Sequence, residues 1–463
     1  NMFAFFIFFK GYMTPCLALN SYQTRKDYFY MFLLGAGGGI RARDLWTSGG
    51  LPLSHILQSI SIYERLRIEY TEKIKCTRRL GHIVYEHKIP TPATLCIWAG
   101  EEKEFLREGT QVPIVRSVAF GYRDVNHWLE VAQGKKPGYI YSRNTNPTVR
   151  AFEEKVRHLE DAQAATSFST GMAAISNSFF ALISPGDRIV SVKDTYGGTS
   201  KLFIEFFPRF KIDVTLCNTT NHEEIEDEIA EGCKVLYLES PTNPTLKVID
   251  ISRLAKAAHR VEATVIVDNT FSTPINQKPL ELGADLVIHS ATKFLCGHAD
   301  AMGGVVCGPL NIVNRVYHYR EINGASLDPT AAYLILRGMK TLYLRIRQQN
   351  ENALQIARFL QSHPLVTKVF YPGLESHENH DIARRQMRGF GGVLSFVLKG
   401  GFDSVQAFLP CLRYAHLAAN LGAVETVAGP PATTSHVECT PEEREAMGIP
   451  ESLIRYSVGI EDA

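Results

Sequence analysis

The sequence lacks a cysteine framework. Its nine cysteines are an odd number and are scattered, and none forms a C-x-x-C pair. This spacing excludes a paired disulfide scaffold and the usual zinc ligand patterns. We therefore expect no metal site and a reducing compartment, with the cytoplasm favoured. Cys296, which follows an apolar pair, is expected to be a small core residue rather than a nucleophile.

The sequence also lacks a charge excess. It has 49 Lys and Arg against 48 Asp and Glu, and the basic residues are dispersed rather than gathered in one stripe. A nucleic-acid-binding surface needs such a stripe, so no nucleic-acid partner is expected. A small charged metabolite is the expected ligand.

Long hydrophobic runs are missing as well. The apolar runs at residues 1–10 and 28–40 are shorter than the ~20 residues needed to span a bilayer, so we expect no membrane span. Neither a basic start nor a clear cleavage site is present, which argues against a secretory signal. Residues 1–93 are expected to form an atypical leader of unknown role. An organelle transit peptide is the less favoured alternative.

A regular alternation of strand and helix patterns begins at about Thr91. Helical spacing is found at 148–160 and 171–183. Short β-branched runs predict strands at 188–192, 212–216, 234–240, 263–269 and 284–290. This order predicts an α/β fold with a large, mainly parallel sheet covered on both faces.

A second region follows this alternation. One long helical pattern runs from Asp328 to about Leu360, and strand patterns follow at 391–398 and 453–459. We expect a smaller C-terminal α/β domain. The predicted division is a first domain over 148–340 and a second over 341–463.

Reactive side chains follow several predicted strands. Ligands of open α/β sheets sit at the carboxyl ends of the strands. Those ends carry Asp268 in VIVDN, Asn243 in YLESPTNP, and Ser290, Thr292 and Lys293 in LVIHSATK. In FSTGMAAI, Gly171 opens a helix whose free N–H groups favour a phosphate.

An anion cradle, a carboxylate and a lysine flanked by hydroxyls are together what pyridoxal 5′-phosphate (PLP) requires. Asp268 is predicted to keep the ring nitrogen protonated, and Lys293 to form the Schiff base. Ser290 and Thr292 are predicted to donate to the phosphate. Each residue alone has an ordinary structural explanation, but their joint order favours PLP. The glycines after Lys293 predict a close-packed turn into the next strand, GGVVCG (303–308).

Motifs from about Thr94 to the end resemble the γ-subfamily of Cys/Met-metabolism PLP enzymes. The motifs are YSRNTNPT, STGMAA, DTYGGT, ESPTNPT, VDNTFSTP, SATKFLCGHAD, YPGLESHENHDIARRQ, PATTSH and RYSVGIED. That family includes cystathionine γ-synthase, cystathionine γ-lyase, methionine γ-lyase and the O-acylhomoserine sulfhydrylases. The resemblance implies a fold-type I PLP-dependent transferase fold and places this chain nearest the cystathionine γ-synthases.

The resemblance also implies residue roles in holding the cofactor. Lys293 forms the internal aldimine and acts as the base, and Asp268 contacts the ring nitrogen. Tyr196 stacks on the ring and assists proton transfer. Gly171, Met172, Ser290 and Thr292 hold the phosphate.

Further implied roles concern the substrate and the oligomer. Arg455 pairs with the substrate α-carboxylate, and Asn243 and Asn420 contact the substrate. Tyr141 and Arg143 reach the phosphate of the neighbouring subunit, so residues 94–147 form an arm that contacts this subunit. The implied assembly is a homotetramer built from dimers that share active sites.

Positions that bear on specificity disagree. Gly198 stands where methionine γ-lyases carry a cysteine, and Ala419–Asn420 stand where cystathionine enzymes carry an acidic residue and a serine. The YPGLESHENHDIARRQ motif favours the cystathionine enzymes. His298 and His436 are expected to pack or hydrogen-bond rather than act as bases.

The prediction is γ-replacement on an O-acylhomoserine in transsulfuration and amino-acid biosynthesis. The alternatives are a carbon–sulfur γ-lyase acting on cystathionine or methionine, and an O-acylhomoserine sulfhydrylase. An alternative of another class is a catalytically silent partner subunit.

Overall fold

The computed structural model describes residues 5–9, 12–16, 90–101, 109–437 and 440–463. The chain separates into two compact units, Asn1–Ile89 and Pro90–Ala463. In the first unit, β1 (Phe5–Phe9) pairs antiparallel with β2 (Tyr12–Cys16). The apolar run at 28–40 lies outside the described residues.

The second unit is built around a seven-stranded sheet with the order β3-β9-β8-β7-β6-β4-β5. Its strands are β3 (Ala164–Phe168), β4 (Arg188–Val192), β5 (Asp213–Cys217), β6 (Val235–Glu239), β7 (Thr264–Asp268), β8 (Leu286–Ser290) and β9 (Gly304–Gly308). Strands β4 to β8 pair in parallel, whereas β9 runs antiparallel to both β8 and β3. The predicted α/β fold and its mainly parallel sheet are confirmed.

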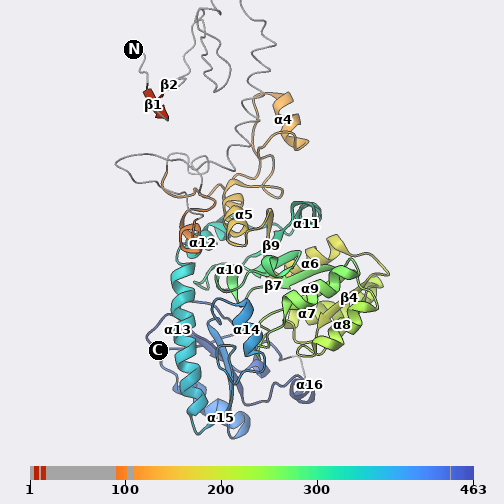
Figure 1. Cartoon of the computed structure of the whole chain (residues 1–463), viewed down its shortest axis with the longest axis vertical. Helices are drawn as coiled ribbons and strands as arrows, with labels where there is room; N and C mark the ends of the chain where they lie inside the picture. Colours follow the sequence, from red (N-terminus) through yellow and green to blue (C-terminus); the bar gives the residue numbers. More distant parts are fainter. Residues whose placement is uncertain (1–4, 10–11, 17–89, 102–108, 438–439) are drawn as a thin grey trace, which may run out of the picture. The chain divides into compact units, whose positions relative to one another are not determined.

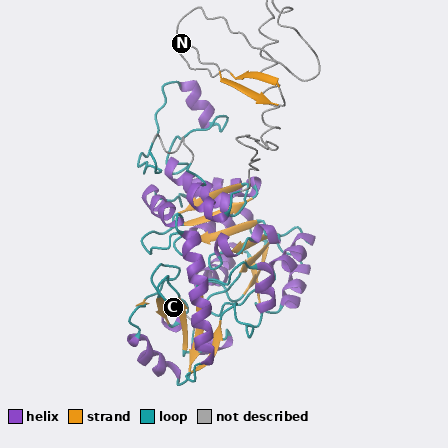
Figure 2. Cartoon of the chain, turned by 60° about the vertical axis from the view of Figure 1, so that its left-hand side comes forward, coloured by secondary structure: helices purple, strands orange, loops and turns teal. Residues whose placement is uncertain are grey.

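Both faces of this sheet are covered, as Figures 1 and 2 show. Alternate residues of β6 belong to different clusters: Tyr237 packs with Phe179 of α6 (Gly171–Leu182), and Leu236 packs with Leu254 of α9 (Ile251–Arg260). The period of two residues places successive side chains on opposite faces. Both faces are therefore apolar, as expected for a covered parallel sheet.

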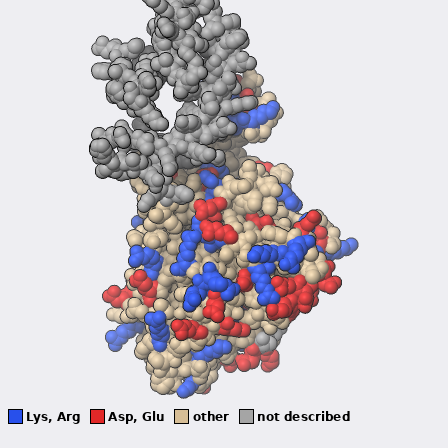
Figure 3. Space-filling model, viewed as in Figure 1, with Lys and Arg blue, Asp and Glu red and all other residues tan. Residues whose placement is uncertain are grey.

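The other α-helices between Pro90 and Asn323 precede, connect or follow the strands of this sheet. They are α2 (Pro92–Trp98), α4 (Val125–Ala132), α5 (Pro147–Leu159), α7 (Gly197–Lys201), α8 (His222–Ala230), α10 (Thr273–Asn276) and α11 (Leu310–Asn323). Asn146 caps α5 by accepting from the N–H groups of Thr148 and Val149. On the face shown in Figure 3, basic and acidic side chains are interspersed.

The prediction of a single long helix from Asp328 to about Leu360 is wrong. The structure has two helices, α12 (Pro329–Met339) and the 21-residue α13 (Leu342–Ser362). The last turn of α12 tightens, because the Thr341 N–H and hydroxyl both bond to the carbonyl of Gly338, at 3.2 and 3.1 Å. No proline marks this break, and the hydrophobic periodicity continues across it. Periodicity alone therefore predicts one helix.

A five-stranded sheet follows α13, with the order β10-β11-β14-β13-β12. Its strands are β10 (Val366–Phe370), β11 (Val393–Leu398), β12 (His416–Leu417), β13 (Val427–Gly429) and β14 (Leu453–Ser457), and its helices are α14 (His380–Gln386), α15 (Gly401–Phe408) and α16 (Pro441–Ala446). Within the described ranges, no helix is long and apolar enough to cross a membrane. The same ranges contain no cluster of His, Cys, Asp or Glu suited to a metal.

Candidate active site

A cavity of about 310 Å³ lies at the carboxyl ends of β6, β7 and β8, where β14 of the smaller sheet meets them. Most of the predicted site residues line it: Gly171, Met172, Tyr196, Asn243, Asp268, Ser290, Thr292, Lys293 and Arg455. They come from distant parts of the sequence. Parallel strand ends and the adjoining small sheet bring them together.

Lys293 lies just beyond β8, and its amine faces the loop after β12. Its Nζ donates to Oδ1 of Asn420 at 2.9 Å. Burial lowers the pKa of Lys293 to about 8, and the positive charge of Arg455 adds to this effect. The uncharged form, which a nucleophile or base requires, is therefore far more populated near neutral pH than in an exposed lysine.

The loop that carries Asn420 packs closely on Lys293. Gly422 has φ +80°, and a Cβ placed on it would lie 2.7 Å from the backbone N of Phe294. Only glycine suits this left-handed conformation and close approach. The packing fixes where Asn420 meets the lysine.

Arg455, on β14, is the second buried cation of the cavity. Its Nη1 donates to Oδ1 of Asn243 at 3.0 Å, and its Nη2 donates to the carbonyl of Asn420 at 3.2 Å. Burial lowers the pKa of Arg455 to about 10, so the group is still cationic at neutral pH. A planar guanidinium held on two sides is suited to bidentate binding of a carboxylate.

Asp268 ends β7 and is buried. Its Oδ1 accepts the N–H of Thr270 at 2.9 Å, and its Oδ2 accepts from the hydroxyl of Tyr237 at 3.4 Å. Burial raises the pKa of Asp268, while the bonds from Thr270, the charge of His289 and the bond from Tyr237 oppose the rise. These partners favour the ionised form, which a protonated ring nitrogen needs.

Sequence reasoning missed two residues beside Asp268. Glu239 is its register partner on β6, and it accepts the N–H groups of Tyr196 at 2.8 Å and Asn243 at 3.1 Å. Burial, with Asp268 next to it, raises the pKa of Glu239 well above its usual range. Thr270 accepts the N–H of Ser290 at 2.8 Å and so joins the ends of β7 and β8. A charged residue ending the apolar run VLYLE was the available signal for Glu239.

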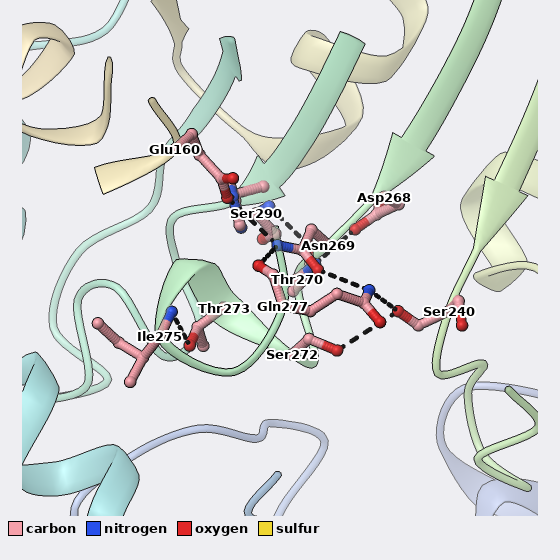
Figure 4. Close-up of polar contacts among 11 residues, drawn as sticks. Glu160, Ser240, Asp268, Asn269, Thr270, Ser272, Thr273, Ile275, Gln277 and Ser290 are labelled. Atoms are coloured by element: carbon pink, nitrogen blue, oxygen red, sulfur yellow. Dashed lines mark hydrogen bonds and ion pairs between the residues drawn. The ribbon is translucent and has the colours of Figure 1, made fainter. Parts of the chain in front are cut away.

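A buried polar network lies behind Asp268 and joins the strand ends (Figure 4). Oε1 of Glu160 accepts from Nε2 of His289 at 2.6 Å and from Nδ2 of Asn269 at 3.2 Å. Nε2 of Gln277 donates to Oδ1 of Asn269 and to the carbonyl of Ser240, both at 3.0 Å. The residues that follow β6 and β7, and one within β8, are thus held in a fixed arrangement.

The sequence model of the family described as Cys/Met metabolism PLP-dependent enzymes matches residues 93–463. The chain belongs to this family. An L-methionine gamma-lyase of Fusobacterium nucleatum subsp. polymorphum is 43% identical over 71% of this chain and 84% of that protein. The chloroplastic cystathionine gamma-synthase 1 of Arabidopsis thaliana is 37% identical over 81% of this chain and 67% of that protein.

Solved structures of this PLP-dependent family agree with the fold. A cystathionine gamma synthase from Xanthomonas oryzae pv. oryzae, in complex with aminoacrylate and cysteine, superposes with a TM-score of 0.76 and 37% identity. The match covers 81% of this chain and 95% of that chain. The fold-type I prediction and the PLP prediction are therefore confirmed.

The residues of this PLP-dependent enzyme fit the cofactor. Thr170 caps α6 by accepting the N–H of Ala173, and a Cβ on Gly171 would lie 2.8 Å from the Cβ of Ser290. A side chain there would collide with Ser290, so glycine allows the start of α6 to lie directly against Ser290. The helix N-terminus with the Ser290 hydroxyl beside it suits a phosphate.

Tyr196 also lines the cavity, at the start of α7, with 47% of its surface exposed. Next to it, a Cβ on Gly198 would lie 2.9 Å from both Sδ of Met172 and Cε1 of Tyr196. The space for a side chain at position 198 is therefore already occupied.

Tyr141 and Arg143 do not line the cavity of their own chain. Arg143 lies over the ring of Tyr141, 5.4 Å from its centroid, and Tyr141 is 41% exposed. Their predicted reach into a neighbouring subunit stays a prediction.

Three other singled-out residues have structural partners. Cys296 is buried in the core, as expected. Nδ1 of His298 bonds to the carbonyl of Cys296 at 2.8 Å, and Nδ1 of His436 bonds to the Ser435 hydroxyl at 2.9 Å. Burial lowers the pKa of His436 to about 4.

Proposed function

We propose that this PLP-dependent enzyme catalyses γ-replacement on an O-acylhomoserine, in the manner of a cystathionine γ-synthase. The observation that carries the proposal is the charge pattern of the cavity. Lys293 and Arg455 offer sites for an amine and a carboxylate, which together fit an α-amino acid. The remaining charged residues of its lining, Glu239 and Asp268, are held by the bonds described above.

The wall beyond these residues is neutral. It includes Ala419, Thr434, Ser435 and Met172. An acyl ester at the γ-carbon, which brings no ammonium group, suits such a wall as the leaving group. The filled space at Gly198 also departs from the cysteine of familiar methionine γ-lyases, which supports replacement.

The chain's own residues have defined tasks in this mechanism. Bound PLP supplies the electron sink that stabilises a carbanion at the α-carbon of the substrate. Asp268 keeps a proton on the ring nitrogen, and Arg455 binds the α-carboxylate with help from Asn243. Nζ of Lys293 would remove the α-proton and then a proton from the β-carbon, so that the acyloxy group can leave the γ-carbon as a carboxylate. The nucleophile would then bond to the γ-carbon, and Lys293 would return protons to the β-carbon and the α-carbon. Asn420 accepts a hydrogen bond from the amine.

The proposed assembly is a homotetramer built from two dimers, and the proposed location is the cytoplasm. Tyr141 and Arg143 are proposed to reach the phosphate of the neighbouring subunit. Their exposed position and absence from the cavity of their own chain support this arrangement.

A γ-lyase is the second candidate. The 43% identity to an L-methionine gamma-lyase favours it, and the neutral wall also suits a thioether substituent.

Product analysis separates the candidates. The holoenzyme is incubated with O-acetylhomoserine or O-succinylhomoserine, with and without cysteine or sulfide. Cystathionine or homocysteine as product supports γ-replacement, and the nucleophile that reacts separates a synthase from a sulfhydrylase. Formation of 2-oxobutyrate and ammonia alone contradicts the proposal and supports the lyase. Absence of any turnover supports a silent partner subunit.

A further inference from the structure

The YPGLESHENHDIARRQ motif (371–386) lies outside the cavity, yet several of its side chains contact one loop of the larger domain. That loop, residues 240–250, carries Asn243 and is called the Asn243 loop below. Nε2 of His377 bonds to the carbonyl of Leu246 at 3.0 Å. Nε2 of Gln386 donates to the carbonyl of Ile249 at 2.9 Å, and Nη2 of Arg385 contacts Oδ2 of Asp250 at 3.0 Å.

The His377 contact has a defined direction. Nδ1 of His377 accepts the N–H of Asn379 at 3.2 Å, so Nε2 carries the proton and donates to Leu246. Burial lowers the pKa of His377 to about 4, so the ring is neutral at ordinary pH. Leu246 has φ +56°, an uncommon conformation for a leucine that its surroundings must hold in place.

The side-chain amide of Gln386 both donates and accepts hydrogen bonds at the end of the same loop. Besides donating to Ile249, its Oε1 accepts the N–H of Ile251 at 3.4 Å. Its Nε2 also lies 3.1 Å from Oε1 of Gln277, which belongs to the network of Figure 4. Apolar packing accompanies these bonds, because the fully buried Val248 packs with Ala383 and Met387 beside α14.

The other half of the Asn243 loop reaches the substrate site. Oδ1 of Asn243 accepts from Arg455 at 3.0 Å, and its N–H donates to Glu239. Ser395 of β11 donates to the carbonyl of Pro244 at 2.7 Å. The loop is therefore held at its far end by α14 and at its near end by residues of the site.

We propose that His377 and Gln386 are positioning residues for Asn243, which hold the loop that presents Asn243 to Arg455 and so set the affinity for the α-carboxylate of the substrate. The inference rests on the proposed function, because it needs an amino-acid substrate whose carboxylate Arg455 binds. It assigns a task to a motif that touches neither the cavity nor Lys293.

The test uses the holoenzyme and two small amines. Glycine carries an α-carboxylate and methylamine does not, and binding of either is followed by the change in the visible absorbance of the lysine-linked cofactor. His377→Ala and Gln386→Ala are expected to weaken glycine binding about tenfold, the size of one lost hydrogen bond, and to leave methylamine binding within twofold. His377→Gln, which retains an N–H donor, is expected to recover part of the loss. Arg384→Ala, at an exposed position of the same helix, is the control and is expected to bind both amines as the parent does.

A double-mutant cycle tests the route through Asn243. In an Asn243→Ala background, His377→Ala is expected to add less than a twofold loss of glycine affinity. Equal losses for glycine and methylamine, unchanged glycine affinity, or a full tenfold loss in the Asn243→Ala background would overturn the inference and leave the proposed function standing. A parent protein whose bound cofactor responds to no amino acid overturns the proposed function and this inference with it.

Discussion

The amine of Lys293 and the side-chain amide of Asn420 lie 2.9 Å apart, although 127 positions separate them in the sequence. The contact joins the end of a strand in the large sheet to a loop of the small one. It holds the lysine by a neutral acceptor, so no carboxylate raises its pKa. The amine is therefore poised between its charged and uncharged forms near pH 8.

The first prediction concerns the capture of PLP by the apoenzyme. Because only the uncharged amine attacks an aldehyde, the rate is expected to rise with pH and to level off above about pH 8. Arg455→Met removes the cation that helps to lower the pKa of Lys293, so the midpoint is expected to move to higher pH. Stopped-flow absorbance measures the rate. If the pH midpoint of the rate in the parent protein lies in the ordinary range of an exposed lysine, Lys293 is not the lowered-pKa amine that captures PLP.

Arg455→Lys is predicted to impair substrate binding despite retaining the charge. A lysine cannot reproduce the two directed contacts to Asn243 and Asn420 while pairing with a carboxylate. We expect kcat/KM to fall about tenfold to a hundredfold, mainly through KM. Steady-state kinetics with the homoserine ester found in the product analysis measures the effect, with the exposed Arg384→Lys as control. An unchanged KM would show that the carboxylate binds elsewhere.

Glu239→Ala is predicted to destabilise the protein. The substitution leaves the buried N–H group of Asn243 and the partly buried N–H group of Tyr196 without their acceptor. The free energy of unfolding is expected to fall by about 2–4 kcal/mol, since each unsatisfied buried group costs ~1–3 kcal/mol. Denaturant titration checks this, with Glu223→Ala at an exposed position as the control. A loss as small as that of the control would mean that water replaces the carboxylate.

The stability of the protein is predicted to decline in mild acid. Burial lowers the pKa values of His377 and His436 from 6.5 to about 4. Between these values the unfolded chain binds more protons than the folded one, so stability is lost as pH falls from about 6.5 to about 4. Urea titrations at several pH values in this range measure the free energy of unfolding. In the His377→Gln/His436→Gln double variant, this free energy is expected to depend less on pH than in the parent. A slope unchanged by the double variant would assign the acid sensitivity to other groups.

Much of the large sheet followed from local patterns, because its strands are short apolar runs that end in polar residues. Lys293 and Asp268 could be predicted for this reason, since Asp268 ends β7 and Lys293 follows the end of β8. β3 was missed, because its sequence AATSF has little β-branched character and gains its place by pairing with β9. The break between α12 and α13 was also missed, since it depends on the tightened last turn at Gly338.

The contacts of the site were less predictable than its residues. Arg455 and Asn243 are 212 positions apart, and only the packing of the two sheets brings them to 3.0 Å. The task of Gln386 depends likewise on a carbonyl of a distant loop. Resemblance to a family supplied roles for Arg455 and Asn243, but none for Glu239, Thr270 or the motif at 371–386.

The turn from Ala419 to Gly422 combines two kinds of constraint within four residues. Gly422 has no room for a side chain and Asn420 accepts from the lysine, whereas Ala419 is exposed and lines the cavity. Three residues apart, one position tolerates no side chain and another has open space beside it. Under the proposed function, a larger residue at position 419 would reshape the cavity wall and leave the contact between Asn420 and Lys293 in place.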